Sequence, residues 1–233
     1  MIAITFALPV ESAAFIKTLS DKRRERSGEL EIVRGKIDNH EIEICHTGVG
    51  EEICRRRMAA FLQDRQSELL ISAGFAGALD PGLKVGDIVI AKNFSSAKIP
   101  DTSRLAGLTV RIGDITTVKH VIDSAEERLR LAETTAAAAV DMETDFIAQA
   151  CAEHALPMIS LRAISDTRAH PLPLPPQVLF DIEQQKTRAG KISLYLLRHP
   201  ARVARMVSFI RQVRTARGAL TRAVVMLPHS KQP

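Results

Sequence analysis

The sequence predicts an α/β protein: a three-layer α/β/α domain around a mixed central sheet, followed by a basic helical extension. Short apolar runs of strand length alternate with segments whose apolar residues recur at helical spacing, and strands predominate early in the chain. With 233 residues, of which 45% are hydrophobic, the chain can bury one sizeable core. We therefore expect one domain over residues 1–183 and an extension over residues 184–233 that packs on it.

The first half of the chain predicts a strand, a helix, a hairpin and a second helix, over residues 2–8, 11–19, 29–48 and 51–64. The strand is a short apolar run that Pro9 ends, and the first helix follows from the spacing of its apolar residues, among them Ile16 and Leu19. In the hairpin, alternating apolar and polar residues flank a turn at Asp38-Asn39.

The second half predicts two strands, a helix, a strand that turns into a helix and a final strand, over residues 68–79, 85–94, 125–133, 136–154 and 156–166. The first of these strands runs into a glycine-containing loop. Ser124 with Glu127 forms the pattern of a capping box, which starts the helix over residues 125–133. A proline-rich stretch over residues 170–177 separates the body of the protein from the basic extension.

Composition excludes several classes of protein. The three cysteines, Cys45, Cys54 and Cys151, match no metal or redox spacing and are expected to be reduced thiols of a cytoplasmic protein. No apolar run reaches the roughly 20 residues of a membrane-spanning helix, and the first residues do not resemble a signal peptide. The histidines show no ligand spacing, so we expect no metal, and no nucleophile elbow is present.

The net charge of +5 is distributed unevenly. No acid follows Glu183, whereas eleven Lys and Arg residues do, so the first 183 residues carry 5 − 11 = −6. The basicity therefore belongs to the extension and requires a local explanation.

Five predicted strand ends carry residues suited to a ligand site: Glu11, Gly48–Gly50, Ala73–Gly77, Met142–Glu143 and Ser165–Asp166. In α/β sheets, ligands bind beyond the carboxyl ends of the strands, so three carboxylates and two glycine turns are expected to face one cleft. The glycines of "GVG" lack the third glycine of a dinucleotide fingerprint, and we expect no cofactor.

Each of these acids has a structural alternative. Asp166 suits either a turn or a general acid that holds a proton near neutrality. Glu143 suits either the positive end of a helix, a role that Asp141 or Asp145 could share, or a vicinal diol such as that of a ribose. Glu11 could start a helix or polarise a water.

The motifs "ALPVE", "TGVG", "SAGFAGALDPGLKVGDIVIA", "AVDMETDFIAQACAEHALP" and "LRAISD" together resemble the nucleoside phosphorylase and nucleosidase superfamily, and most closely its methylthioadenosine/S-adenosylhomocysteine nucleosidases. The resemblance runs from Ile2 to about Asp166 and thins between Asn93 and Ala136. It implies that Asp166 protonates the purine leaving group at N7 and that Glu11 activates the attacking water. It also implies substrate contacts by Glu143 on the ribose hydroxyls, Met142 on the ribose, Val118 at the base, and Ser165, Phe75, Ala76 and Gly77.

Two departures from that family bear on the nucleophile. Phe75 stands where the nucleosidases usually have a serine, and the loop after the first strand lacks the Gly- and Arg-bearing phosphate loop of the phosphorylases. The nearest basic candidates for phosphate are Arg55, Arg56 and Arg57, for which a solvated helix face is the alternative. Because Glu11 is retained, hydrolysis is favoured over phosphorolysis.

The extension predicts a basic amphipathic helix, with one apolar stripe over Val203, Met206, Val207, Ile210 and Val213. Such a helix could pack on the domain or a dimer partner, lie on an anionic membrane surface, or bind nucleic acid, for which aromatic residues are scarce. The extension also resembles that of hopanoid-associated phosphorylases.

That second resemblance implies release of adenine from adenosylhopane, a nucleoside joined to a triterpene, by a cytoplasmic homo-oligomer that touches the inner membrane face. The alternatives are a methylthioadenosine/S-adenosylhomocysteine nucleosidase, a phosphate-dependent purine nucleoside phosphorylase, and a non-catalytic nucleoside-binding or membrane-associated scaffold. We expect a small nucleoside and water, or phosphate, as partners and no nucleic acid.

Overall fold

The computed structural model describes residues 1–63, 67–99, 101–169, 171–175, 178, 180–181, 186–187 and 189–227. Its first half contains β1 (Ile2–Phe6), α1 (Pro9–Thr18), β2 (Ser20–Ser27), β3 (Leu30–Ile37), β4 (His40–His46), α2 (Glu51–Leu62), β5 (Leu69–Ala78) and β6 (Ile88–Ala91). The second half contains the 3₁₀-helix η1 (Thr102–Arg104), β7 (Val110–Gly113), β8 (Ile115–Thr117), α3 (Ala125–Thr135), β9 (Ala139–Asp141), α4 (Thr144–Glu153), β10 (Met158–Asp166), β11 (Phe180–Asp181), β12 (Lys186–Thr187), α6 (Ala189–Arg198), the 3₁₀-helix η2 (Pro200–Arg202) and α7 (Val203–Met226).

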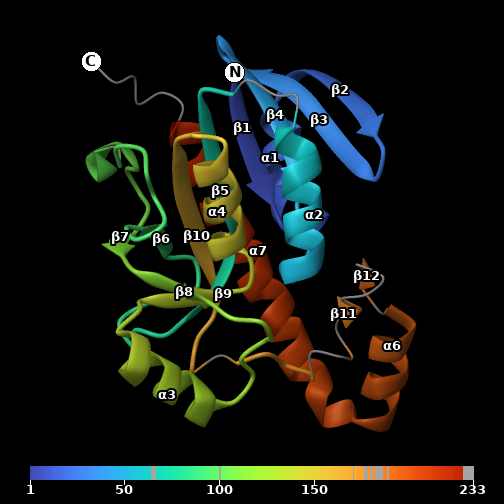
Figure 1. Ribbon diagram of the computed structural model, residues 1–233. Coiled ribbons are helices and arrows are strands. Elements are labelled where there is room, and N and C mark those ends of the chain that lie inside the picture. The colour runs from blue at the N-terminus through green and yellow to red at the C-terminus, as the bar shows by residue number, and fades with distance from the viewer. Residues whose placement is uncertain are drawn as a thin grey trace.

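The central sheet is mixed, in the order β2-β3-β4-β1-β5-β10-β6-β7, with β9 pairing both β5 and β8 (Figure 1). Strand β1 runs parallel to β4 and β5, and β5 runs parallel to β10, whereas β6 is antiparallel to β10. The carboxyl ends of β1, β5 and β10 therefore lie at one edge of the sheet. This confirms the predicted mixed sheet and brings the expected site loops together.

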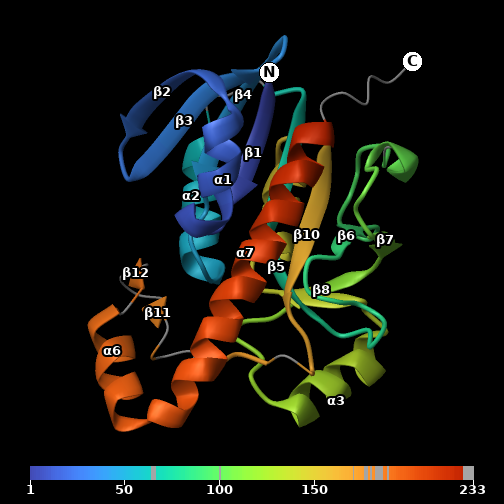
Figure 2. The same cartoon turned by 180° about the vertical axis from the view of Figure 1, so that it is seen from behind.

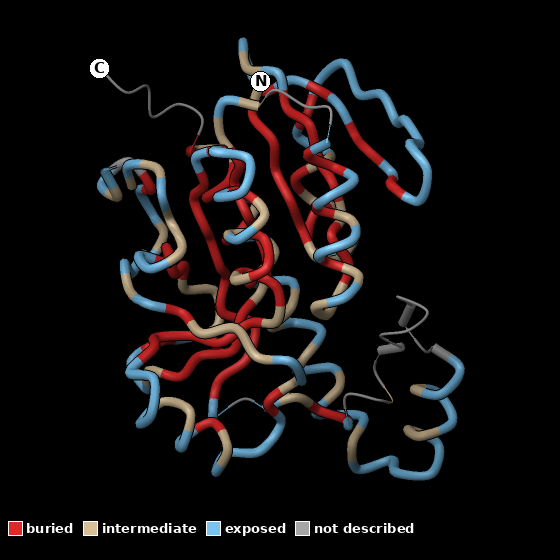
Figure 3. The backbone as a smooth tube through the Cα atoms, in the orientation of Figure 1, coloured by how far each residue is buried: buried red, intermediate tan, exposed pale blue. Residues whose placement is uncertain are grey.

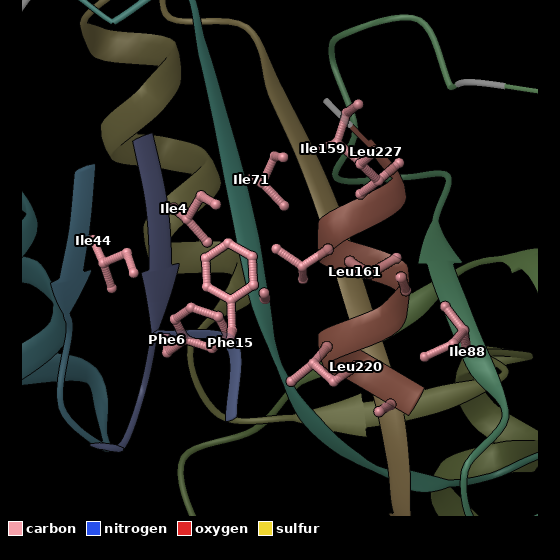
Figure 4. Packing of buried hydrophobic residues seen from close by; sticks show 14 of the residues in the cluster. Ile4, Phe6, Phe15, Ile44, Ile71, Ile88, Ile159, Leu161, Leu220 and Leu227 are labelled. Carbon is pink, nitrogen blue, oxygen red and sulfur yellow. The ribbon is translucent and has the colours of Figure 1, made fainter. Parts of the chain in front are cut away.

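Helices cover both faces of the sheet, which confirms the three-layer architecture. One core cluster joins Phe15 of α1 and Leu220 of α7 to strand residues such as Ile4 and Leu161, as Figure 4 shows. The opposite cluster joins α2 and α4 to the other face, with Phe61 among its fully buried residues. Turning the molecule shows α1 and α7 together on the face opposite α2 and α4 (Figure 2).

Strand β2 is absent from the sequence-based prediction, as are the short strands β7 and β8. All eight residues of β2 are exposed and most are charged, so the strand has no alternating apolar pattern that could reveal it. It forms by backbone pairing with β3 at the sheet edge, and its charges suit an edge that must not pair further.

Helix α7 is divided into two parts by burial. Its second half is in the core, where Ala216, Leu220 and Val224 are fully buried against the sheet, whereas most of its first half is exposed (Figure 3). Helix α6 stands beside that exposed half and away from the sheet (Figure 1). The expected boundary between domain and extension, at residues 183–184, lies outside the described residues. In the part of the chain that the structure describes, no helix is long and apolar enough to cross a membrane.

Candidate active site

Glu11 lies in the first turn of α1, directly beyond β1, and is buried. One carboxylate oxygen accepts a hydrogen bond from the backbone N–H of Leu8 at 2.8 Å, and the other accepts one from Phe75 N–H at 2.9 Å. The side chain thus joins the start of α1 to β5. Position 74 is suited to glycine because a Cβ there would lie 3.3 Å from Glu11 Oε1.

Glu143 is buried at the start of α4, immediately after β9. Its Oε1 accepts a hydrogen bond of 3.1 Å from the backbone N–H of Gly50. Gly50 has a φ of 93°, a left-handed conformation that a side chain would strain, which explains the glycine in the "GVG" loop. The contact brings together residues that are 93 positions apart.

Asp166 is the last residue of β10, where it pairs in register with Gly77 of β5. Its Oδ2 accepts a hydrogen bond from the Ser165 hydroxyl at 2.9 Å. Its Oδ1 accepts one from Arg128 Nη2 at 2.5 Å, in an ion pair of two buried side chains. A Cβ at position 77 would lie 2.7 Å from Arg128 Nη1, so the glycine makes room for this pair.

Arg128 is a residue that sequence reasoning missed. It lies on α3, and it also donates to the carbonyl oxygens of Ala78 at 2.9 Å and Ile122 at 3.3 Å. The only local signal was an arginine on the helix "AEERLRLAE", where exposure is the default expectation. Its proximity to Asp166 arises from the fold.

Asp141 is buried in an ion pair with Arg162 of β10, whose Nε lies 2.8 Å from Asp141 Oδ2. Asp141 also accepts from the Thr144 hydroxyl and from Thr117 Oγ1, and Arg162 donates to Ser72 O at 2.7 Å. This network fixes β9 and the start of α4 against β5 and β10. The carboxylate of Asp141 is therefore occupied by this network. Glu143, at the same junction between β9 and α4, is the acid that contacts the Gly50 loop.

Burial dominates the electrostatics of the two glutamates. Burial, together with the negative charges of Asp141 and Glu11, raises the pKa of Glu143 to about 8, against the hydrogen bond from Gly50 and the charge of Arg162. Burial also raises the pKa of Glu11, opposed by its backbone hydrogen bonds and by the charge of Arg162. Because the charge of Arg162 acts on both glutamates, the two carboxyl groups share one electrostatic environment.

The other predicted site residues surround these acids to different extents. Ala76 and Ser165 are buried, Phe75 is half-buried, and the Ser165 hydroxyl also approaches Ala76 O at 3.4 Å. Met142 is half-buried between Asp141 and Glu143. Val118 donates its N–H to Asp141 O at 2.8 Å, and its side chain packs in a small apolar cluster with Leu79, Ile122, Ala137 and Val140.

A cavity of about 1010 Å³ adjoins the Asp166 end of this region. Residues from β5, α3, the segment after β10 and α7 line it, among them Ala78, Arg128, Thr167 and Arg211. Neither Glu11 nor Glu143 lines the cavity, so it lies beside the three acids and shares Arg128 with them. The hydrogen-bonded carboxyl groups, rather than the cavity, carry the groups that are able to transfer protons.

The three consecutive arginines of α2 are engaged in other contacts. Arg55 donates to Glu51 and Gln149 and lies 4.7 Å from the Phe146 ring centroid, Arg56 donates to Glu29, and Arg57 donates to His46 O. Among the residues that the structure describes, no group of three or more His, Cys, Asp or Glu could hold a metal ion.

The fold and the site define a class: a three-layer α/β protein with buried carboxyl groups at the carboxyl ends of parallel strands. A family model described as the phosphorylase superfamily matches residues 1–107 and 96–198. The chain therefore belongs to the phosphorylase superfamily.

Individual relatives are more distant. A 5'-methylthioadenosine/S-adenosylhomocysteine nucleosidase of Staphylococcus haemolyticus is 27% identical over 196 residues, which cover 71% of this chain and 86% of the relative. One from Shewanella loihica is 22% identical and covers 85% of this chain and 99% of the relative.

Two solved structures share the fold over almost the full length of this chain. The nucleosidase of the same name from Neisseria meningitidis, in complex with methylthio-immucillin-A, has a TM-score of 0.72 at 19% identity and covers 99% of each chain. The futalosine hydrolase of Helicobacter pylori has a TM-score of 0.70 at 17% identity and covers 98% of this chain and 97% of that one.

Proposed function

We propose that this chain hydrolyses the N-glycosidic bond of an adenine-bearing nucleoside of the methylthioadenosine or S-adenosylhomocysteine type. The observation on which the proposal rests is that Glu11, Glu143 and Asp166 are gathered, buried, at one edge of a phosphorylase-superfamily sheet. The named nucleosidases among the relatives support it.

In this proposal Asp166 is the general acid. Cleavage of the bond between C1' and N9 leaves its electron pair on the purine, and a proton delivered to N7 makes the purine a better leaving group. Ser165 orients one oxygen of Asp166, while Arg128 occupies the other. An ion-paired carboxylate carries no proton, so proton delivery requires that Arg128 leave Oδ1 and that Asp166 take up a proton from water before it protonates N7.

Glu143 binds the ribose hydroxyls, because a carboxylate can accept two hydrogen bonds from a vicinal diol. In its ionised form, which predominates only above its raised pKa of about 8 in the free protein, it also supplies negative charge beside a sugar that becomes positive in the transition state. Glu11 takes a proton from the water whose oxygen attacks C1'. The two backbone N–H groups that hold Glu11 fix its position for this step.

Water is favoured over phosphate as nucleophile because the arginines of this region are already engaged. Arg128 pairs with Asp166 and Arg162 pairs with Asp141. The three arginines of α2 all donate to other protein groups. A phosphate would need convergent basic side chains or backbone donors. The side chain of Phe75 has no polar group that could hold either water or phosphate, so it does not distinguish the two nucleophiles. Its backbone N–H already donates to Glu11.

A second candidate substrate is adenosylhopane, with the same reaction and the same acids. The observation that favours it is the exposed apolar and basic surface of α6 and the first half of α7, which suits an enzyme whose substrate is lipid-bound. The relatives named above favour the water-soluble substrates, which we therefore place first.

The test is chromatographic detection of adenine released from methylthioadenosine, S-adenosylhomocysteine, adenosine and detergent-dispersed adenosylhopane, each with and without phosphate. We expect release without phosphate, and Asp166→Asn should lower kcat by about 100- to 10,000-fold. The matched control is Asp123→Asn, an exposed acid on the loop before α3, which should retain full activity. Strict dependence on phosphate would overturn the role of Glu11, and absence of release from every substrate would overturn the proposal.

A further inference from the structure

We propose that α6, η2 and the first half of α7 form a docking surface for an anionic lipid bilayer. This hairpin surface consists of five apolar and three basic residues: Leu194, Leu197, Val203, Val207 and Ile210 with Lys191, Arg198 and Arg214. The proposal is independent of the reaction assigned above.

Exposed apolar side chains concentrate on this part of the molecule. Of the eight large hydrophobic residues that are exposed in the described part of the chain, five belong to the hairpin surface. Leu197, the most exposed of them, has 80% of its surface accessible. Such a concentration marks an interaction site more often than chance exposure does.

The exposed positions of α7 follow one face of the helix. Val203, Val207 and Ile210 fall at i, i+4 and i+7, and the same stripe continues through Arg214 and Gly218, which are also exposed. The buried residues Ala216, Ala219, Leu220, Ala223 and Val224 lie on the other side of the same helix. The helix therefore uses one face for the core and presents a second, apolar face to solvent.

The positive charge of the segment indicates the kind of partner that it binds. After Glu183 the chain has eleven Lys and Arg residues and no acid, whereas the first 183 residues carry −6. An anionic lipid surface complements the positive charge of the extension, and apolar side chains that enter the headgroup region are removed from water at the same time. The combination of the two features favours a bilayer over partners that satisfy only one of them.

Two other partners fit less well. A symmetric contact with a second copy would place the same arginines opposite one another, because an isologous interface repeats each patch. Nucleic acid would leave the five apolar side chains facing phosphates. It would also find few aromatic rings on which its bases could stack. Tyr195 already packs against His199, with ring centroids 4.4 Å apart, and Phe209 is half-buried.

The test is co-sedimentation of the full chain with vesicles of phosphatidylcholine alone or mixed with phosphatidylglycerol. We expect binding to the mixed vesicles only, weakened by added salt. The double variant Leu197→Glu/Val207→Glu should abolish it, and Arg198→Gln/Arg214→Gln should weaken it by roughly fivefold for each cation removed. The matched controls are Ile112→Glu, an exposed apolar residue of β7, and Arg130→Gln on α3, both of which should bind as the original chain does.

Adenine release from soluble methylthioadenosine, measured on the same samples, separates this proposal from the proposed function. The hairpin variants should keep that activity, so loss of vesicle binding alone supports the docking surface. Failure of the full chain to bind mixed vesicles overturns the docking proposal whatever the activity. A second outcome would also overturn it. In that outcome the Leu197→Glu/Val207→Glu variant still binds vesicles as the original chain does, but it loses a concentration-dependent dimerisation or a binding to duplex DNA that the original chain shows.

Discussion

Glu143 is a proposed site acid whose pKa lies far above its ordinary value. The pKa rises from 4.5 to about 8, chiefly because the side chain is buried. Between these two values the folded chain holds a proton that the unfolded chain has lost. The folded state therefore binds more protons, and the free energy of unfolding falls as the pH rises through this window.

The variant Glu143→Gln tests this. The amide has no charge to bury, so the variant should gain thermal stability relative to the original chain as the pH rises from about 4.5 to about 9, and the difference should become constant below about pH 4.5. Melting temperatures across this range provide the measurement. A constant difference at every pH would mean that the ionisation of Glu143 does not contribute. Glu126→Gln, at an exposed position of α3, serves as the control and should show no trend.

Arg128 and Asp166 show how one residue pair can connect a helix to the site. Replacing Arg128 by Met removes the cation and leaves a buried carboxylate without its partner, which should reduce the free energy of unfolding by about 3–5 kcal/mol. Arg130→Met, on the same helix but in an exposed pair with Glu126, should change it by less than about 1 kcal/mol. Urea unfolding measures both variants, and equal effects would contradict the structural importance of the buried pair.

At the scale of an element, α7 carries two different faces along its length. Leu220 is fully buried against the sheet, so Leu220→Ala should cost about 2–5 kcal/mol through lost burial and a remaining cavity. Leu197 on α6 is mostly exposed, so Leu197→Ala should leave stability nearly unchanged. Chemical denaturation of both variants tests the division, and a large effect of Leu197→Ala would indicate a tertiary partner for α6.

The predicted hairpin β3–β4 and the unpredicted edge strand β2 show what element prediction can and cannot achieve. Strand β3 and helix α2 have clear apolar periods, β5 is a continuous apolar run, and the start of α3 is predicted by its capping-box pattern. Each of these elements forms close to where its pattern predicts. Ser124 caps α3 as expected, since its side chain accepts the N–H of Glu127 at 3.0 Å. Strand β2 has no such pattern, because its stability comes from pairing with β3 rather than from burial of its side chains.

At the scale of the whole molecule, the extension is part of the fold as well as an appendage. Five residues of α7 join the core between α1 and β10, so removing residues 190–233 exposes apolar surface of both elements. We expect the truncated chain to aggregate or to unfold without a cooperative transition, as circular dichroism during heating would show. Cooperative unfolding near the melting temperature of the full chain would contradict the role of α7 in the core.

The sequence by itself determined the α/β class, most of the helices and strands, and three acids at the expected strand ends, because these follow from local periodicity and from where a strand stops. The comparisons supported the superfamily that the motifs predicted. Roles for Asp166, Glu11 and Glu143 stay predictions that activity measurements must test. Only the tertiary structure decided which groups face these acids, namely Arg128 for Asp166, Phe75 for Glu11 and Gly50 for Glu143. These partners lie 38, 64 and 93 positions away, and strand order, which no local pattern encodes, brings them within hydrogen-bonding distance.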